Sequence, residues 1–197
     1  MTDQNRSPTV HSPVRRPTVL SIRGAIMAGV FAGVLFGVNF GFQALVGLLG
    51  MPGASGFVTG FTVPFGLALV SQINKEWGTA TTSWTLYSLL AIPTLLMGLP
   101  GPYKLILGFL GGLVYDVGYC GLRFRRAGLY VALVLYTAVL AAGFYAVWRL
   151  GLFPDMPEER VIKILVVVSA VFLVEGIIST RCATWFYSKR LGRIVEA

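Results

Sequence analysis

Two carboxylic acids lie inside long apolar stretches of the sequence, where an ionisable side chain is costly and is a candidate for function. Asp116 stands in "LILGFLGGLVYDVGYCG" and Glu175 in "ILVVVSAVFLVEGIIS". Each is followed by an arginine, Arg123 or Arg181, near the expected end of its segment. One interpretation is that ion pairs or hydrogen bonds pin these two segments together near the inner membrane surface. A proton or cation path and a contact with a partner protein are the alternatives.

The motifs of the common enzyme mechanisms are missing from the sequence. It has no phosphate-binding loop ending in Gly-Lys-Ser/Thr and no His-Glu-x-x-His motif. The single histidine, His11, lies in a polar leader, so the apolar part of the chain cannot form a Ser/His/Asp triad. The two cysteines, Cys120 and Cys182, lack the spacing of metal ligands. We therefore expect no enzymatic activity, no metal and no cofactor.

Other polar and aromatic residues suggest a binding site. Asn39 and Gln43 are four residues apart, so they share one face of a helix. Tyr87, Tyr103 and Tyr145 fall at a similar expected depth on other segments. Polar groups that converge from several helices, with aromatic neighbours, suit a small-molecule pocket open to the outside. We expect these five residues to bind a substrate, and an interfacial aromatic belt is the alternative.

The elements that must position these residues are membrane helices. The chain has 197 residues, of which 55% are hydrophobic and 12% charged, and its mean hydropathy is +0.75. A soluble domain carries about twice that share of charge. No residue is charged in the ranges 24–74, 77–103 and 127–148. Because a membrane helix needs about 20 apolar residues, the chain is predicted to cross the membrane several times.

We predict an all-α protein built as a bundle of about six transmembrane helices, at about 23–49, 56–73, 79–98, 103–122, 128–150 and 161–182. Pro64 is expected inside the second helix, and Pro93 is expected to kink the third. The domain plan is a flexible cytoplasmic tail at 1–20, a transmembrane domain at 21–187 and a basic cytoplasmic tail at 188–197.

Charge predicts the orientation of the bundle. Six passes place both termini on one side, and twelve of the sixteen Lys and Arg residues then lie on that side. The positive-inside rule makes this side cytoplasmic. We attribute the net charge of +8 to this asymmetry and to anionic lipid headgroups. No nucleic-acid partner is expected, because no stacking platform or nucleic-acid motif accompanies the basic residues.

These features, with the segment "LPGPYKLILGFLGGLVYDVGYCG" at 99–121, resemble the S components of energy-coupling factor (ECF) vitamin transporters. In that family the loop before the fourth helix often carries Gly-Pro, as Gly101 and Pro102 do here. A glycine-rich helix with an Asp near its inner end follows, as Asp116 does here. The resemblance covers about 20–185. It implies capture of a vitamin or related micronutrient outside a prokaryotic plasma membrane, then delivery with a transmembrane coupling protein and a pair of cytoplasmic ATPases. The alternative class is a non-transport structural or assembly subunit of a membrane complex.

A ladder of small residues marks the first helix, at every fourth position of "GAIMAGVFAGVLFGVNFG". Small residues let helix backbones approach closely in a membrane, and the S-component resemblance implies that they dock the coupling partner. Each step of four residues turns the position by about 40°, so one parallel neighbour cannot follow the whole row. We expect the inner part to dock a partner (Ala25, Gly29, Gly33) and the outer part to pack inside the bundle (Gly37, Gly41). Packing of the whole row inside the bundle is the alternative.

Overall fold

The computed structural model describes residues 18–50, 54–151 and 156–191. Most of the predicted tail at 1–20 and the last residues of the tail at 188–197 lie outside these ranges. The described elements are β1 (Thr18–Val19), α1 (Ile22–Leu48), α2 (Ala54–Asn74), β2 (Glu76–Trp77), α3 (Thr79–Ala91), α4 (Tyr103–Gly121), α5 (Arg126–Arg149), α6 (Glu158–Phe186) and the π-helical turn η1 (Tyr187–Leu191).

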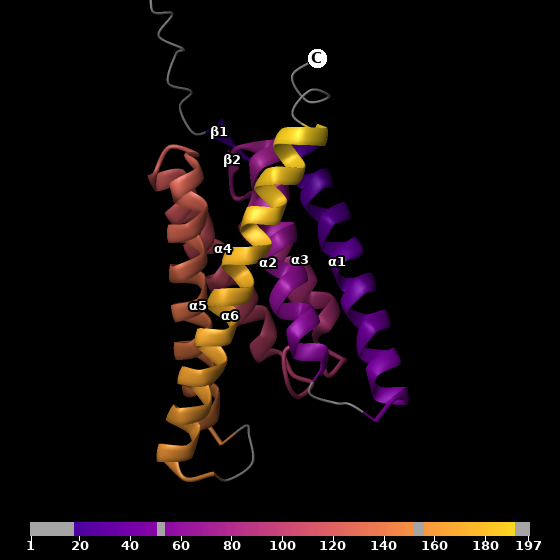
Figure 1. Cartoon of the computed structure of the whole chain (residues 1–197), viewed down its shortest axis with the longest axis vertical. Helices are drawn as coiled ribbons and strands as arrows, with labels where there is room; N and C mark the ends of the chain where they lie inside the picture. Colours follow the sequence, from indigo (N-terminus) through magenta and orange to yellow (C-terminus); the bar gives the residue numbers. More distant parts are fainter. Residues whose placement is uncertain (1–17, 51–53, 152–155, 192–197) are drawn as a thin grey trace, which may run out of the picture.

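The six α-helices pack as a closed ring in the order α1, α3, α4, α5, α6, α2. They alternate in direction, so α1 begins and α6 ends at the same end of the bundle (Figure 1). We name this the inner end, after the predicted orientation, and the opposite end the outer end. At the inner end β1 pairs in parallel with β2, and the Glu76 carboxylate accepts hydrogen bonds from Ser21, the N-cap of α1.

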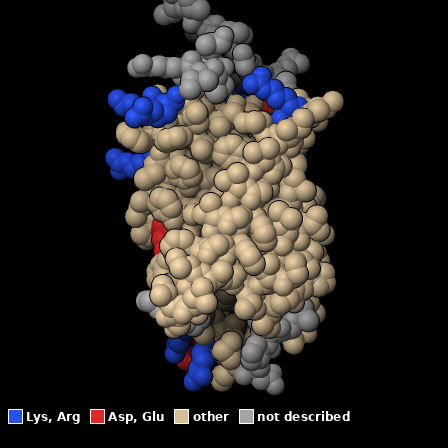
Figure 2. Space-filling view, turned by 90° about the vertical axis from the view of Figure 1, so that its right-hand side faces the viewer, with Lys and Arg blue, Asp and Glu red and all other residues tan. Residues whose placement is uncertain are grey.

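Four helices are long and apolar enough to cross a membrane: α1, α2, α5 and α6 with its π-helical turn. Their outward faces carry exposed branched apolar side chains, such as Val34 on α1 and Val166 on α6. Lys and Arg gather toward the two ends of the face seen in Figure 2, and its broad middle shows neither. The chain therefore has the character of a helical membrane protein.

The third helix is shorter than predicted. It ends at Ala91 instead of about residue 98, because Pro93 lacks the N–H that would continue the helical hydrogen bonds. Its 13 residues span roughly 20 Å, less than the roughly 30 Å of a hydrocarbon core. The fourth helix holds Lys104 and Asp116 and is also outside the group of four. Six membrane spans therefore remain a prediction from the sequence.

The interior of the ring holds polar and large aromatic side chains. The largest fully buried side chains include Trp84, Tyr87, Tyr115 and Tyr136. Glycines let α4 approach both of its neighbours. A methyl group on Gly112 would lie 2.6 Å from Cα of Thr81 on α3, and one on Gly118 would lie 2.7 Å from Cα of Ala132 on α5. The close packing of α4 against α3 and α5 therefore depends on these glycines.

Candidate functional site

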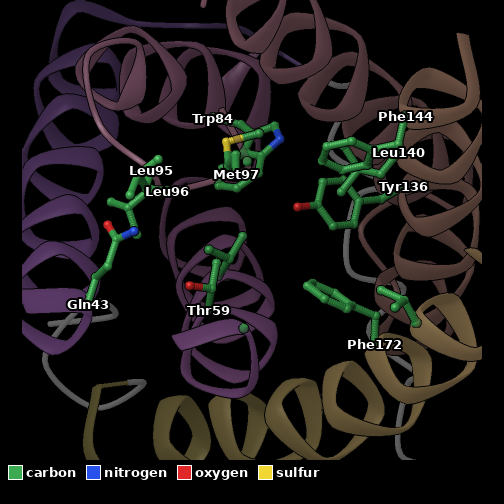
Figure 3. A pocket seen from close by; sticks show the side chains of 14 residues that line it. Gln43, Thr59, Trp84, Leu95, Leu96, Met97, Tyr136, Leu140, Phe144 and Phe172 are labelled. Atoms are coloured by element: carbon green, nitrogen blue, oxygen red, sulfur yellow. The ribbon is translucent and has the colours of Figure 1, made fainter. Parts of the chain in front are cut away.

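A cavity of about 250 Å³ lies inside the outer half of the ring. Its walls come from α1, α2, α3, α5, α6 and the non-helical residues 95–98 that follow α3 (Figure 3). The lining residues are Gln43, Gly56, Thr59, Val63, Trp84, Leu95, Leu96, Met97, Gly98, Tyr136, Leu140, Phe144, Val168 and Phe172.

The lining of the cavity is aromatic and uncharged. Trp84 is 2% exposed and stacks on Tyr87 with ring centroids 4.7 Å apart, and Tyr136 meets its edge at 5.7 Å. The indole N–H of Trp84 is buried without a hydrogen-bond partner among the described residues. These contacts hold the two rings in fixed positions on the wall, so a ligand would meet a preformed surface.

The wall of the cavity carries neutral polar groups from Gln43, Thr59, Trp84 and Tyr136. The Tyr136 hydroxyl points into it, and the Gln43 amide lies at the opposite side (Figure 3). Tyr136 is 2% exposed, and no described residue hydrogen-bonds its hydroxyl or the Gln43 amide. A buried hydroxyl without a partner is unfavourable, so a ligand that supplies one would be favoured at this position.

The wall formed by residues 92–102 is held by the first residues of α4. Lys104 is fully buried, and its Nζ donates to the carbonyl oxygens of Ala91 at 3.0 Å and Thr94 at 2.6 Å. The Tyr103 hydroxyl donates to the carbonyl oxygen of Leu99 at 2.7 Å. Non-helical backbone at membrane depth requires such partners, because no water is present to satisfy it. Tyr103 thus supports the cavity wall without lining the cavity.

The predicted binding residues are spread over the outer half, and only Gln43 lines the cavity. Asn39 accepts from the Thr62 hydroxyl at 2.8 Å and donates to the Leu35 carbonyl, so it joins α1 to α2. Tyr87 is buried behind Trp84, beside Asn39.

Tyr145 stands at the outer end of α5, away from the cavity. Its hydroxyl donates to the Glu158 carboxylate at 2.6 Å and accepts from Arg149 at 3.0 Å. Arg149 in turn pairs with Glu158 at 2.7 Å, which closes the small network. This network joins the end of α5 to the start of α6.

The predicted network between the two intramembrane acids is wrong in its partners. Asp116 accepts hydrogen bonds from the backbone N–H groups of Ala80 at 3.1 Å and Thr81 at 2.8 Å, and from the Thr81 hydroxyl at 2.7 Å. It therefore caps the start of α3 and makes no ion pair with Arg123 among the described residues. The open first turn of α3 offers unpaired N–H groups, which favour a carboxylate there.

Glu175 faces α2, where it packs against Gly60. One of its carboxylate oxygens is buried with no hydrogen-bond partner in the described chain, and Arg181 makes no ion pair with it there. Glu175 also lines an apolar groove between α2 and α6, which shares Gly56, Val168 and Phe172 with the cavity.

The glycine ladder faces away from the bundle. A methyl group would meet nothing within 4 Å at Gly33, Gly37 or Gly41, and only Leu86 at 3.7 Å from Gly29. Ala25 is half-buried, whereas the buried face of α1 is formed by other residues, such as Ala28 and Ala32. The expectation that Gly37 and Gly41 pack inside the bundle is wrong, because α1 turns its Ala28, Ala32, Leu35 and Asn39 face inward and leaves Gly37 and Gly41 exposed.

Sequence reasoning missed Trp84, Thr59, Tyr136 and Phe172 on the cavity wall. A signal was present for two of them. Trp84 lies in the hydroxyl-rich stretch "TATTSWTLYS", and Tyr136 with Thr137 interrupts the apolar middle of α5. Polar side chains in the middle of a membrane helix indicate a face that is turned toward other helices. Phe172 carried no such signal within its apolar surroundings.

The described residues bring no three His, Cys, Asp or Glu side chains together as possible metal ligands. Comparisons with protein-family models, with curated proteins and with solved structures give no match to this chain. The resemblance to S components therefore stays a prediction from the sequence motifs.

Proposed function

We propose that this protein is a membrane-embedded binding subunit that captures a small vitamin-like compound from the outer side. Delivery across a prokaryotic plasma membrane would then require a separate transmembrane coupling protein and a pair of cytoplasmic ATPases. The chain itself carries no ATP-binding loop, so the energy must come from such partners.

The observation that carries this proposal is the cavity between the helices. An apolar, aromatic cavity with a few polar groups aimed into it is the usual form of a small-molecule site. Tyr136 is 2% exposed, and its hydroxyl has no hydrogen-bond partner in the described part of the chain, which is unusual for a polar group inside a bundle. The half-buried Gln43 amide adds a second polar group to the wall. A purely structural subunit would gain from filling this space, so the cavity favours a binding role over an assembly role.

The outward glycine face of α1 supports the second half of the proposal. Gly29, Gly33 and Gly37 present backbone to the surroundings and leave room for another helix to approach. Glycine lowers the stability of a helix by about 1 kcal/mol relative to Ala, so a ladder that meets only Leu86, at Gly29, among the described residues needs another reason. A coupling protein packed against this face supplies one.

The proposal is tested by purifying the protein from its native membrane and analysing its bound small molecules by mass spectrometry. We expect one metabolite at a one-to-one ratio. Leu140→Trp, which places an indole at the cavity wall, should lose it. Val134→Trp, on the exposed face of the same helix, should retain it.

The contrary result is a protein that carries no stoichiometric metabolite and purifies without a coupling protein or ATPases. That result would favour the structural or assembly role. Retention of the metabolite by both tryptophan variants would place the binding site elsewhere in the molecule.

A further inference from the structure

We propose that the ligand of the cavity is an uncharged compound of one or two rings that presents a hydrogen-bond acceptor to Tyr136. This inference rests on the proposed function and names the class of molecule for the same site. It is carried by the charge, the shape and the polar groups of the cavity wall.

The absence of charge on the wall argues for an uncharged ligand. None of the fourteen lining residues is Lys, Arg, His, Asp or Glu. The buried ammonium group of Lys104 is already engaged by the carbonyl oxygens of Ala91 and Thr94. An ionised ligand would lose its hydration on entry and would find no opposite charge on the wall, which is strongly unfavourable.

The shape of the wall argues for a small flat molecule. Trp84, Tyr136, Phe144 and Phe172 present aromatic surfaces from three helices (Figure 3). The volume of about 250 Å³ lies just below the usual range for ligand pockets, which begins at about 300 Å³. One or two rings would therefore fill the space, and aromatic faces favour ring-shaped partners.

The polar groups argue for an acceptor at one edge of that molecule. The Tyr136 hydroxyl can donate one hydrogen bond, and it points into the cavity with no hydrogen-bond partner among the described residues (Figure 3). At the opposite side the Gln43 amide can donate or accept. A ring nitrogen or carbonyl oxygen facing Tyr136 would satisfy the buried hydroxyl.

The carboxylate of Glu175 lies near the cavity and could attract a cationic ligand. Glu175 lines the adjacent groove between α2 and α6, together with Gly56, Val168 and Phe172, which also line the cavity. Glu175 is not itself part of the cavity wall, and it packs against Gly60 of α2. A cationic ligand drawn by Glu175 is therefore the competing class, and the test includes it.

The test is isothermal titration calorimetry on the full chain in lipid nanodiscs, freed of co-purified ligand, with empty nanodiscs as the blank. Four probes share one ring system: quinoline, naphthalene, quinoline-2-carboxylate and N-methylquinolinium. We expect saturable one-to-one binding of quinoline. Naphthalene lacks the acceptor and should bind about three- to tenfold more weakly, as for one lost hydrogen bond. Both charged probes should bind at least about tenfold more weakly than quinoline.

Two tyrosine variants identify the hydroxyl group. Tyr136→Phe should lower the affinity for quinoline to that for naphthalene and leave naphthalene binding unchanged. Tyr115→Phe is the matched control, because the Tyr115 hydroxyl is also buried without a described partner but does not line the cavity. It should leave both affinities unchanged.

The proposal is overturned if quinoline shows no saturable binding, or if either charged probe binds as tightly as quinoline. Tight binding of N-methylquinolinium that Glu175→Gln removes would assign a cationic ligand. In that case small-molecule capture stands and only the ligand class fails. The proposed function fails separately, if no metabolite and no coupling partner accompany the purified protein.

Discussion

At the scale of single residues, Asp116 stabilises the bundle through the first turn of α3. Its carboxylate accepts from two backbone N–H groups and one hydroxyl, all on residues Ala80 and Thr81. Gly78 begins this helix with a φ of +93° and offers no capping side chain of its own. The cap of α3 therefore comes from α4, which ties the folding of one helix to its packing against the next.

Replacing Asp116 by Asn should destabilise the protein by about 2–3 kcal/mol, because the amide group keeps one acceptor and turns its own donors toward N–H groups. Ligand affinity should change little, since Asp116 lies outside the cavity lining. Thermal unfolding in detergent measures the effect. Glu175→Gln is the control and should not lower the stability, because Glu175 has an oxygen without a partner. Equal losses in both variants would contradict the capping role.

Lys104 is the second residue with a structural task. Lys104→Met should destabilise the protein by about 2–3 kcal/mol and weaken ligand binding, because two carbonyl groups of the cavity wall lose their partner. Lys163→Met is the matched control. Lys163 is exposed, and Glu159 is its only ion-pair partner among the described residues, so its loss should leave the unfolding temperature and ligand binding unchanged. A stable Lys104→Met variant with normal binding would show that the wall does not depend on this side chain.

The sequence predicts how far along the bundle the candidate binding residues lie, but not the direction in which their side chains point. Gln43, Tyr103 and Asn39 all lie toward the end of the bundle that we name the outer end. The direction in which each side chain points depends on the order of the helices around the ring, which hydropathy does not contain. Gln43 therefore reaches the cavity, Asn39 turns to α2, and Tyr103 turns to the backbone of residues 97–99.

At the scale of elements, glycine serves two different purposes in this chain. On α4 it permits contact between backbones, as at Gly118 against Ala132 of α5. On α1 it leaves an outward face open, as at Gly37. Both α1 and α4 are rich in glycine in the sequence, and only the packing of the helices distinguishes the two purposes.

These two purposes predict that substituting glycine by alanine has opposite effects on the stability of the protein at the two sites. Gly118→Ala should destabilise the protein by about 1–3 kcal/mol, because the new methyl group would lie 2.7 Å from Cα of Ala132. Gly37→Ala should be neutral or stabilising by up to about 1 kcal/mol, because it meets open space and favours the helix. Chemical unfolding in mixed micelles measures both. A destabilising effect at Gly37 would mean that the ladder packs inside the chain.

The presence of six helices was predicted correctly from the sequence, because long apolar runs of this kind rarely form another secondary structure. Five of the helices begin and end within a few residues of the expected positions, and the third is the exception. Its apolar run continues to Met97, but Pro93 and Gly98 end the helix and turn the chain back toward α4. Hydropathy alone cannot separate a helix from an apolar non-helical segment that is buried among other helices.

At the scale of the whole molecule, the six alternating helices place the start of α1 and the end of α6 at the inner end of the bundle, and the sequence predicts that this end faces the cytoplasm. Single cysteines introduced at Glu159 and Ser188, in a chain lacking Cys120 and Cys182, should react with a membrane-impermeant maleimide from opposite sides in intact cells. Glu159 should react from outside, because twelve of the sixteen cations would lie on the inner side. Reaction of both cysteines from the same side would contradict the six-pass arrangement.

The outward glycine face of α1 is the surface that the proposed coupling protein would contact. In the proposed assembly, leucine at Gly29 or Gly33 would hold the two helix backbones apart, and co-purification of the coupling protein and the ATPases should be lost. Both positions are open or loosely contacted within the chain, so folding and ligand binding should persist.

Gly47→Leu is the matched control, because Gly47 is equally open but lies at the outer end of the same helix. It should retain the partners if docking uses the inner half. The measurement is affinity purification of each variant from its native membrane, with ligand binding measured on the same samples. Loss of partners from all three variants would extend the contact along the whole of α1. Retention by Gly29→Leu and Gly33→Leu would remove this face from the proposed assembly.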